Sequence, residues 1–584
     1  MNTHTPHKLC VSILPTSHEE LFLLLERCKR ELGCEPMSYE PNVEPTLERC
    51  AEPYIVELRL DALALHEAQN LDWQRVCRTF PQVLVTYRIA TEGGYFHSSE
   101  QQRAALYQAA IDAGVFAIDV EYAAWQGIEP LLRWNASTML VLSHHRFEPE
   151  GEHDEGGLPL SGLKTLLRAM FQSEPQGVNV VHKLIFTAND VHAALTAAWA
   201  RAFASEHGKT LIIHAMGEAG EVSRIIGGVA LDSRALPNAD TVQAGIVSST
   251  IPYIPPNAWT YTALDANSGT ASGQITLHEA RHLYRLAHGE ALHSEALRSN
   301  APPRLYGLLG FPTKHSKGKV LHNLMYSRLE AEHASPSYHP VRRLYIHFPT
   351  PDAERFWRLW NKILSGFSIT IPHKERIYGL LEREGILSEE ARLSGVCNTA
   401  VKSTSGVWHG YNTDVLALVD CFAPQREHWA HGVVVFGTGA TTQSALTALH
   451  LCGLQHVTVV GRNAERGAML AERYGTRFVT PNNAAALIQQ GFSGIVQTTS
   501  VGMFPNTDEI VEGAEALLVG MNNLVVMDVV YNPRRTRLLQ RAEECGHRTI
   551  AGEEMFLRQA AHQMRLFTGD AVDLAALREL WERL

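Results

Sequence analysis

Between Lys8 and His288, short apolar runs alternate with longer stretches of helical periodicity. This alternation is typical of parallel strands joined by crossover helices, and eight strands is the number in a TIM barrel. The sequence therefore predicts an N-terminal (β/α)8 barrel of the α/β class, with strands at 9–14, 55–60, 83–88, 116–122, 139–144, 178–186, 211–216 and 259–264.

Charged or polar residues come at the end of nearly every predicted strand. In a TIM barrel the carboxyl ends of all the strands meet at one face, and the chemistry takes place there. We expect a site at this face, drawn from Glu57, Arg59, Arg88, Glu92, Asp119, Glu121, His145, Lys183 and Arg224.

A second apolar pattern begins at Arg304, after residues 289–303, which have no sustained pattern and contain Pro-Pro as a linker would. Four blocks then place Ser, Thr, Asn, Lys or Asp directly after an apolar run. Many directional hydrogen-bonding groups suit a polyhydroxylated ligand. The blocks are residues 310–323, 366–374, 395–401 and 410–414.

Residues 433–466 show the order strand, glycine turn, helix, strand. Gly437 and Gly439 permit a tight turn, and the amides at the start of the helix, near Thr441, can bind a pyrophosphate. The third small position is Thr442 and not glycine. The pattern predicts a Rossmann lobe, although the glycines alone would also fit an ordinary strand-to-helix turn.

The second strand of this motif ends at Arg462 and Asn463, and Arg466 follows. An NAD-binding fold presents an acidic residue here to the ribose 2′-hydroxyl. Two guanidinium groups suit a 2′-phosphate, so the sequence predicts NADP as the cofactor. The alternative is two solvated surface arginines.

Composition adds several limits. A length of 584 residues predicts three or four domains, and a net charge of -11 with a pI near 6.2 argues against a nucleic-acid partner. The nine cysteines are scattered without a CxxC motif, which favours free thiols in a reducing compartment. No run reaches membrane-spanning length and the first residues lack a signal-like apolar core, so we expect a cytoplasmic protein with no membrane partner.

His278, Glu279 and His282 match the HExxH pattern of zinc proteases. The apolar residues of the same helix form one stripe, and both histidines project from the opposite face. No third ligand follows them. We therefore expect solvent-facing histidines and no metal site.

Several motifs of the first half resemble the type I 3-dehydroquinate dehydratases, in family order. They are residues 57–61, 86–94, 119–122, 143–147, 216–224 and 272–275, with the strand that carries Lys183. The resemblance implies that Lys183 forms a Schiff base, His145 moves the protons and Glu92 orients His145. It also implies that Arg224 holds the substrate carboxylate and that Glu57, Arg59, Arg88 and Gln274 contribute to substrate binding.

The chemistry supports the first two roles independently. An iminium is an electron sink that acidifies the adjacent C–H, and a buried lysine flanked by cations loses its proton readily. A neutral imidazole can take the proton and return it to the departing hydroxyl. Two features depart from the family: Arg146 replaces an Asp, and insertions stand near 35–53, 148–158 and 235–257.

Residues 304–584 resemble shikimate dehydrogenase over their whole length, including 497–503, 527–539 and 552–563. The resemblance implies that Lys374 and Asp414 form the catalytic pair. It assigns substrate binding to Ser316, Thr370, Asn398 and Gln559, and cofactor contacts to Gly437, Gly439, Ala440, Thr442, Arg462, Asn463, Arg466, Thr499 and Met503. Gly318 departs from the family, which has a second serine there.

The two halves together resemble the bifunctional family that joins both activities in one chain. The predicted domains are a barrel at 1–288, a linker at 289–303, a substrate lobe at 304–425 completed by 553–584, and a Rossmann lobe at 426–552. The expected substrates are 3-dehydroquinate, 3-dehydroshikimate and shikimate. Two alternatives stay open: a quinate or dual dehydrogenase in the second half, and a non-catalytic metabolite-binding regulator.

Overall fold

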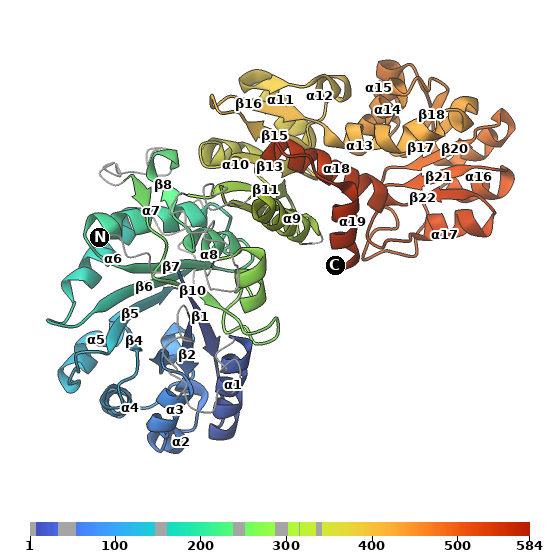
Figure 1. The fold of residues 1–584 in the computed structure, drawn as a ribbon. Coiled ribbons are helices and arrows are strands. Elements are labelled where there is room, and N and C mark those ends of the chain that lie inside the picture. Colours follow the sequence, from blue (N-terminus) through green and yellow to red (C-terminus); the bar gives the residue numbers. More distant parts are fainter. Residues whose placement is uncertain are drawn as a thin grey trace. The chain divides into compact units, whose positions relative to one another are not determined.

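Eight parallel strands form the sheet of the N-terminal half in the computed structural model (Figure 1). Residues 7–32, 54–146, 160–237, 252–286, 302–314, 316–333 and 341–584 are described. The sheet has the order β10-β1-β2-β3-β4-β5-β6-β7. Its strands are β1 Lys8–Ile13, β2 Tyr54–Arg59, β3 Val83–Thr86, β4 Ala117–Glu121, β5 Met139–Arg146, β6 Val180–Thr187, β7 Leu211–Met216 and β10 Trp259–Thr262. The ends of the order approach each other, because Ala258 donates to the Leu211 carbonyl at 3.2 Å. The predicted eight-stranded barrel is confirmed.

Successive residues of each strand point into and out of the barrel. The inner layer nearest the amino ends of the strands is apolar and consists of Cys10, Ile55, Leu84, Ala117, Val141, Val181, Ile212 and Trp259. Tyr261, two residues after Trp259 on β10, belongs to the same cluster. The next inward position on each strand is two residues later and is mostly polar: Ser12, Glu57, Thr86, Asp119, Ser143, Lys183 and His214. All of these polar side chains are buried. The barrel thus has an apolar floor under a polar chamber.

Helices follow the barrel strands. They are α1 His18–Glu31, α2 Leu65–Gln69, α3 Trp73–Thr79, α4 Glu100–Asp112, α5 Tyr122–Ile128, α6 Leu160–Gln172, α7 Ala193–Glu206 and α8 Glu221–Gly227. Polar caps begin three of them: Ser17 accepts from the Glu20 amide, Asp72 accepts from the Arg75 amide, and Ser99 and Gln102 form a capping box. A short antiparallel pair, β8 Leu231–Asp232 and β9 Tyr253–Ile254, comes before β10.

A six-stranded mixed sheet follows, in the order β12-β11-β13-β15-β16-β14. Its strands are β11 Arg304–Gly310, β12 Arg343–Pro349, β13 Gly366–Ile369, β14 Ile386–Leu387, β15 Thr399–Lys402 and β16 Trp408–Tyr411. The accompanying helices are α9 Gly318–His333, α10 Ala353–Trp360, α11 Lys374–Glu384, α12 Glu389–Ser394 and α13 Thr413–Phe422. Catalytic candidates lie at the first turns of α11 and α13.

A second six-stranded sheet is parallel throughout and has the order β19-β18-β17-β20-β21-β22. This is the strand order of the Rossmann fold, so the predicted lobe is confirmed. The strands are β17 Val433–Phe436, β18 Val457–Val460, β19 Arg477–Val479, β20 Gly494–Gln497, β21 Val525–Asp528 and β22 Arg548–Ile550. The helices are α14 Ala440–Leu451, α15 Ala464–Tyr474, α16 Ala514–Gly520 and α17 Arg537–Glu544.

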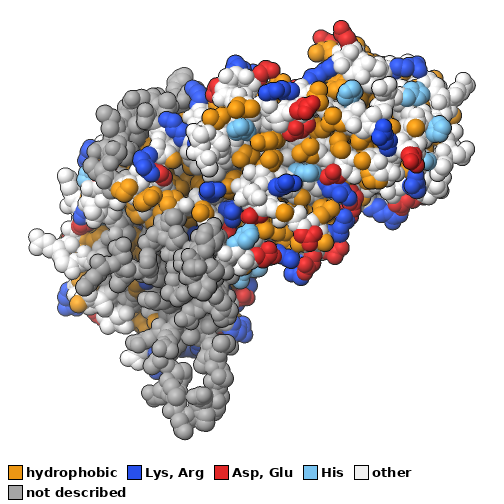
Figure 2. Space-filling model, turned by 45° about the horizontal axis from the view of Figure 1, so that its top comes forward, with side chains coloured by type: hydrophobic (Ala, Val, Ile, Leu, Met, Phe, Trp, Pro, Cys, Tyr) orange, Lys and Arg blue, Asp and Glu red, His pale blue; other side chains and the backbone are white. Residues whose placement is uncertain are grey.

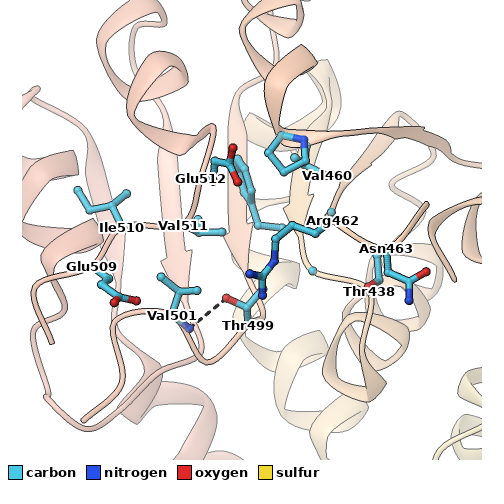
Figure 3. A pocket seen from close by; sticks show the side chains of 14 residues that line it. Thr438, Val460, Arg462, Asn463, Thr499, Val501, Glu509, Ile510, Val511 and Glu512 are labelled. Atoms are coloured by element: carbon cyan, nitrogen blue, oxygen red, sulfur yellow. Dashed lines mark hydrogen bonds between the residues drawn. The ribbon is translucent and has the colours of Figure 1, made fainter. Parts of the chain in front are cut away.

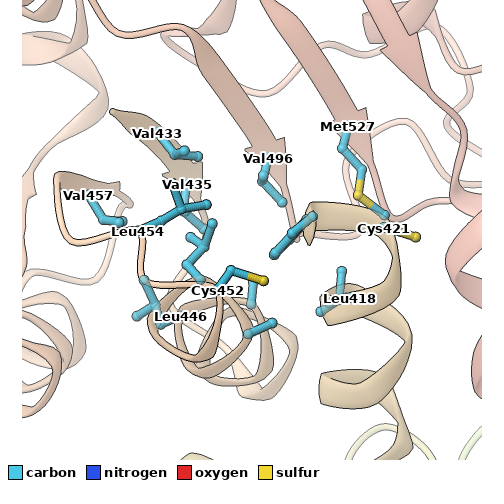
Figure 4. Close-up of a cluster of buried hydrophobic side chains, with 14 of the residues drawn as sticks. Leu418, Cys421, Val433, Val435, Leu446, Cys452, Leu454, Val457, Val496 and Met527 are labelled. Carbon is cyan, nitrogen blue, oxygen red and sulfur yellow. The ribbon is translucent and has the colours of Figure 1, made fainter. Parts of the chain in front are cut away.

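One apolar core joins this sheet to the helix that precedes it. Val433 and Val435 of β17 pack with Leu446 of α14 and with Leu418 of α13 (Figure 4). The closing helices are α18 Gly552–Thr568 and α19 Leu574–Glu582. Gln563 of α18 donates to Thr399 and accepts from Ser368, so α18 returns to the mixed sheet as expected.

The chain divides into two compact units. One comprises Met1–Leu305 with Tyr326–Thr350 and Arg355–Ile363, and the other comprises Tyr306–Met325, Pro351–Glu354 and Leu364–Leu584. On the face drawn in Figure 2, acidic and basic side chains are interspersed with apolar ones. Within the described ranges, no helix is both long and apolar enough to cross a bilayer. Most of the predicted linker and of the three insertions lies outside these ranges.

Candidate active sites

Lys183 of β6 lies in the polar chamber of the barrel and is 5% exposed. Its Nζ donates to Asp119 Oδ2 at 2.9 Å, and Glu57 Oε1 lies 3.6 Å away. The ring of Tyr261 has its centroid 4.3 Å from Nζ. The sequence led us to expect cations around this lysine, whereas its closest charged partners are carboxylates. These neighbours would stabilise the positive charge of an iminium formed on this nitrogen.

Asp119 links Lys183 to a buried arginine. Arg88 donates to Asp119 Oδ1 at 2.8 Å, to Glu121 Oε1 at 3.0 Å and to Ser143 Oγ at 2.7 Å. Burial opposes ionisation of Asp119, but Arg88 and Lys183 outweigh burial and lower its pKa to about 2. The carboxylate therefore stays ionised beside Lys183. The Arg88 guanidinium already donates to these three side chains. Its main role is therefore to hold Asp119, Glu121 and Ser143 in position, and it has few N–H groups left for a ligand.

His145 ends β5 and lies against Glu92. Glu92 Oε2 accepts from both the His145 amide and its Nδ1, each at 2.9 Å. Burial, and then the positive charges of Arg88 and Lys183, lower the pKa of His145 well below its usual value. Burial raises the pKa of Glu92 to about 7 against the opposing charge of Arg88. A neutral imidazole that donates from Nδ1 keeps Nε2 as its basic nitrogen.

The neighbouring His144 occupies a different environment. Its Nδ1 lies 3.8 Å from Glu92 Oε1, which is too long for a hydrogen bond. Burial and Arg146 lower the pKa of His144. Arg146, the departure from the family pattern, thus acts on His144 and is not among the principal charges that depress His145.

Arg224 of α8 is 2% exposed, and its Nε has no hydrogen-bond partner. Burial lowers its pKa to about 10, and no carboxylate pairs with it among the described residues. Arg59, in contrast, is held by Asp61 through two bonds of 2.9 Å. Gln274 accepts from the Thr270 amide at 3.0 Å. Of the three arginines expected to bind substrate, only Arg224 lacks an internal carboxylate, which suits an anionic ligand.

The second candidate site contains Lys374 and Asp414. Lys374 is the first residue of α11, and its Nζ donates to Asp414 Oδ2 at 2.5 Å. Both side chains are mostly buried, with exposures of 12% and 7%. A lysine that bonds a carboxylate in this way can hold and deliver a proton.

The start of α13 is fixed by two asparagines. Asn398 Oδ1 accepts from the Thr413 amide at 2.8 Å, and Asn412 caps the helix through the Val415 amide. Because Asp414 lies in this first turn, both asparagines help to set its position. Asn398 is therefore next to the predicted catalytic pair.

Ser316 and Gly318 lie at the start of α9. The Ser316 hydroxyl accepts from the Gly318 amide at 3.2 Å and also bonds to Tyr531. Burial raises the pKa of Tyr531, and the bond to Ser316 opposes this shift. Among the described residues, a Cβ on Gly318 would meet only Ser316 Oγ, at a tight 3.2 Å. A serine here would therefore press on the Ser316 hydroxyl, and the glycine leaves that position open.

Thr370 and Gln559 complete the predicted substrate set. Thr370 follows β13 and donates its amide to the Leu309 carbonyl at 2.9 Å. A Cβ on Gly310 would come within 2.3 Å of the Thr370 side chain, so Gly310 makes room for it. Gln559 is half-buried on α18.

The glycine turn after β17 has the predicted geometry. Gly437 has φ of +126°, and a Cβ there would lie 2.5 Å from Thr498 Oγ1, so only glycine fits. A Cβ on Gly439 would meet nothing within 4 Å, which leaves space over the start of α14 at Ala440. Thr442 replaces the third glycine, and its hydroxyl accepts from the Gly439 amide at 3.1 Å.

A cavity of 610 Å³ adjoins this turn (Figure 3). Arg462 and Asn463 line one side, and the side chain of Arg462 points towards Thr499. Thr499 accepts from the Val501 amide at 3.2 Å. Met503 is 40% exposed farther along the same loop. The open space at Gly439 and the exposed Arg462 fit a dinucleotide with a phosphorylated ribose.

Arg466 differs from the expected arrangement. Its amide donates to Asn463 Oδ1 at 3.0 Å, but its guanidinium forms an ion pair with Glu375 of α11. We expected both arginines to be free at the ribose. In the structure Arg462 lines the cavity, whereas Arg466 already has an acidic partner.

The HExxH residues lie in a π-helix at Glu279–Leu283. His278 and His282 are exposed, as predicted. Glu279 is engaged locally, since it accepts from the Thr276 amide at 2.9 Å. Among the residues that the structure describes, no cluster of three or more potential metal ligands occurs.

Comparisons with known proteins support the predicted family of each half of the chain. The family model for type I 3-dehydroquinase matches residues 42–248, and that for the shikimate dehydrogenase substrate binding domain matches 308–400. An NADP(+)-dependent shikimate dehydrogenase of Caulobacter vibrioides is 32% identical over 274 residues, which cover 45% of this chain and 90% of that protein. The chain belongs to the shikimate dehydrogenase family.

It is a fused member of this family. A chloroplastic bifunctional 3-dehydroquinate dehydratase/shikimate dehydrogenase of Arabidopsis thaliana is 27% identical over 548 residues, which cover 90% of this chain and 79% of that one. A solved shikimate dehydrogenase of Thermus thermophilus is 26% identical and covers 48% of this chain and 99% of its own, with a TM-score of 0.41.

Two residues that contact the predicted catalytic and binding groups had been given no individual role from the sequence. Asp119 was noted only as one of several strand-end carboxylates, and Tyr531 was not singled out, although its motif was. Both could have been found from position: Asp119 is the inward residue of β4, and Tyr531 follows β21 in the cofactor sheet. Their partners, Lys183 and Ser316, are distant in sequence.

Proposed function

We propose that this chain dehydrates 3-dehydroquinate to 3-dehydroshikimate in the barrel, at 1–288, and reduces the product to shikimate with NADPH in the second half. There the substrate lobe would be 304–425 with 553–584, and the cofactor lobe 426–552. The observation that carries the proposal is that one chain contains two separate lysine–carboxylate pairs, Lys183 with Asp119 and Lys374 with Asp414. Each pair lies beside the groups that its reaction requires.

In the first reaction, Lys183 passes its ammonium proton to the neutral imidazole of His145, and the free amine attacks the substrate ketone. The imidazolium returns the proton to the carbinolamine hydroxyl, which leaves as water and gives an iminium. The cation remains between Asp119 and Glu57, which already stabilise a positive charge at this position. His145 takes the proton from the carbon beside the iminium, and the imidazolium then protonates the departing hydroxyl. Water hydrolyses the imine and frees Lys183. Arg224, which has no carboxylate partner in the part of the chain that the structure describes, binds the substrate carboxylate, with Gln274, Arg59 and Arg88 supporting the site.

In the second reaction the dinucleotide lobe would hold NADPH, which would supply a hydride for the ketone carbon. Lys374 donates the proton that the carbonyl oxygen needs, and Asp414 holds Lys374 in position. Ser316, Thr370, Asn398 and Gln559 bind the substrate hydroxyls and carboxylate. Arg462 and Arg466 bind the 2′-phosphate, while Gly437, Gly439, Ala440, Thr442, Asn463, Thr499 and Met503 receive the rest of the cofactor.

The deciding experiment supplies 3-dehydroquinate and NADPH to the full chain and identifies the products over time. We expect 3-dehydroshikimate to appear and then shikimate, with one NADPH consumed per shikimate. Lys183→Ala should stop the first step only, and Lys374→Ala should let 3-dehydroshikimate accumulate. Ligand binding without turnover at either site would instead support the metabolite-binding regulator.

Gly318 supports a second candidate for the dehydrogenase, namely oxidation of quinate. Quinate carries a hydroxyl on its carboxylate-bearing carbon that shikimate lacks. The position that the missing side chain of Gly318 leaves open, where a Cβ would meet only Ser316 among the described residues, would receive this hydroxyl. The test compares kcat/KM for quinate and shikimate. Comparable values, shifted towards shikimate by Gly318→Ser, would support this candidate, and inert quinate would exclude it.

We also propose that the protein acts in the cytoplasm. The seven cysteines within the described ranges are all free thiols, as expected in a reducing compartment. Fractionation of cells that express a tagged full-length chain would test this location, and recovery in an organelle would contradict it.

A further inference from the structure

Glu375 stands at the junction between the substrate helices and the cofactor helices of the dehydrogenase. It is the second residue of α11, directly after Lys374. Its Oε1 accepts from Gln443 of α14 at 2.9 Å and from the Arg466 guanidinium of α15. One carboxylate oxygen thus receives donors from two helices of the Rossmann lobe.

The Arg466–Glu375 pair is open to solvent, with side-chain exposures of 44% and 47%. An ion pair of this kind is weak and is readily exchanged for a stronger partner. A ribose 2′-phosphate carries more negative charge than one carboxylate and offers three acceptor oxygens. A bound 2′-phosphate should therefore replace Glu375 as the partner of the Arg466 guanidinium.

We propose that Glu375 is a specificity-determining residue for the cofactor, because it competes with the 2′-phosphate for Arg466. This inference rests on the proposed role of Arg466 at the 2′-phosphate. In the cofactor-free chain Arg466 is held by Glu375. NADP binding draws the guanidinium away, so part of the attraction for the phosphate is offset by the lost pair. NAD has no 2′-phosphate and leaves the pair intact.

The negative charge of Glu375 also weakens NADP binding directly. Once Arg466 has moved, an uncompensated carboxylate stands near the doubly charged phosphate and repels it. Gln443 remains as a donor to Glu375 and limits this cost. Removing the charge while keeping the shape should therefore improve NADP binding and leave NAD binding unchanged.

The test uses the full chain and measures dissociation constants for NADP+ and NAD+ at low ionic strength. Glu375→Gln should tighten NADP+ about two- to fivefold, the range for loss of an exposed ion pair, with no change for NAD+. The gain should shrink as salt is added, because exposed charges are screened. KM for NADPH should fall in parallel with the dissociation constant.

A matched control is available on the same helix. Arg376 pairs with Glu354 at 2.5 Å, and this pair is also exposed. Glu354→Gln removes a similar surface pair of α11 without touching Arg466, and it should leave both cofactors unaffected. An equal gain in Glu354→Gln would mean that any loss of acidic charge has the effect, and would overturn the proposal.

Arg466→Gln distinguishes a failure of this inference from a failure of the proposed role of Arg466 at the 2′-phosphate. If Arg466→Gln does not weaken NADP+, Arg466 does not bind the phosphate and the cofactor assignment itself fails. If it does weaken NADP+, while Glu375→Gln weakens NADP+ or leaves it unchanged, only the competition is refuted. In the double variant Glu375→Gln, Arg466→Gln, the gain from the first change should vanish, since its target is gone.

Discussion

The hydrogen bonds between Glu92 and His145 give a quantitative prediction for dehydration. Glu92→Gln keeps an acceptor for the His145 amide and Nδ1 but removes its charge. A hydrogen bond to a charged group contributes about 1.5–3 kcal/mol, and a neutral one about 0.5–1.5 kcal/mol. The difference, about 1–1.5 kcal/mol at the imidazolium stage, corresponds to a fall in kcat of roughly 5- to 13-fold.

The same change should alter the pH profile. The pKa of Glu92 is raised to about 7, chiefly by burial, so the carboxylate loses its charge as pH falls through this value. A protonated Glu92 supports the imidazolium less well, and turnover of the unmodified protein should decline below about pH 7. Because Gln does not titrate, this inflection should be absent from Glu92→Gln.

The assay follows the conjugated product of dehydration by its ultraviolet absorbance between pH 5.5 and 8.5. His144→Ala is the control, since His144 lies beyond hydrogen-bond distance of Glu92. It should keep both the rate and the inflection. An unchanged rate in Glu92→Gln, with the inflection still present, would show that Glu92 does not act through its charge on His145.

Three further predictions concern the other assigned groups. Borohydride with 3-dehydroquinate should add mass at Lys183, and His145→Ala should keep this adduct while losing about 10²- to 10⁴-fold in turnover; labelling of Lys183→Ala would refute the assignment. Arg462→Asp should narrow or reverse the preference for NADPH in steady-state kinetics, whereas equal use of both cofactors by the unmodified chain would contradict the reasoning. Asp414→Asn should lower kcat for ketone reduction about 10²- to 10⁴-fold with little change in KM, and an effect on KM alone would make Asp414 a binding residue.

Much of the fold could be predicted from local patterns. The eight barrel strands and the motif from Val433 to Arg466 depend on apolar runs, period and glycine placement, which act over a few residues. Gly437 is a good example, because the turn itself requires a φ of +126° at this position, which favours glycine. The site residues that end strands were predictable for the same reason, since strand ends of a parallel barrel meet at one face.

Two of the pairings were not predicted, whereas the resemblance had already implied the pairings of Glu92 with His145 and of Lys374 with Asp414. Lys183 lies 64 positions after Asp119, and Arg466 lies 91 positions after Glu375, so only the packed fold brings each pair together. An exposed arginine at position 466 carries no local information about which anion it will meet. Sequence patterns therefore indicated which groups are present, and the tertiary structure determined which charges are already neutralised.

The carboxylates around Lys183 also bear on covalent modification. Formation of the imine exchanges one singly charged nitrogen for another, so Asp119 and Glu57 face a cationic partner both before the substrate binds and in the iminium. Reductive alkylation of Lys183 preserves that charge as a secondary ammonium, and the modified protein should remain as heat-resistant as the parent. Acylation gives a neutral amide, leaves two buried carboxylates facing no lysine cation, and should lower the melting temperature as well as abolish dehydration.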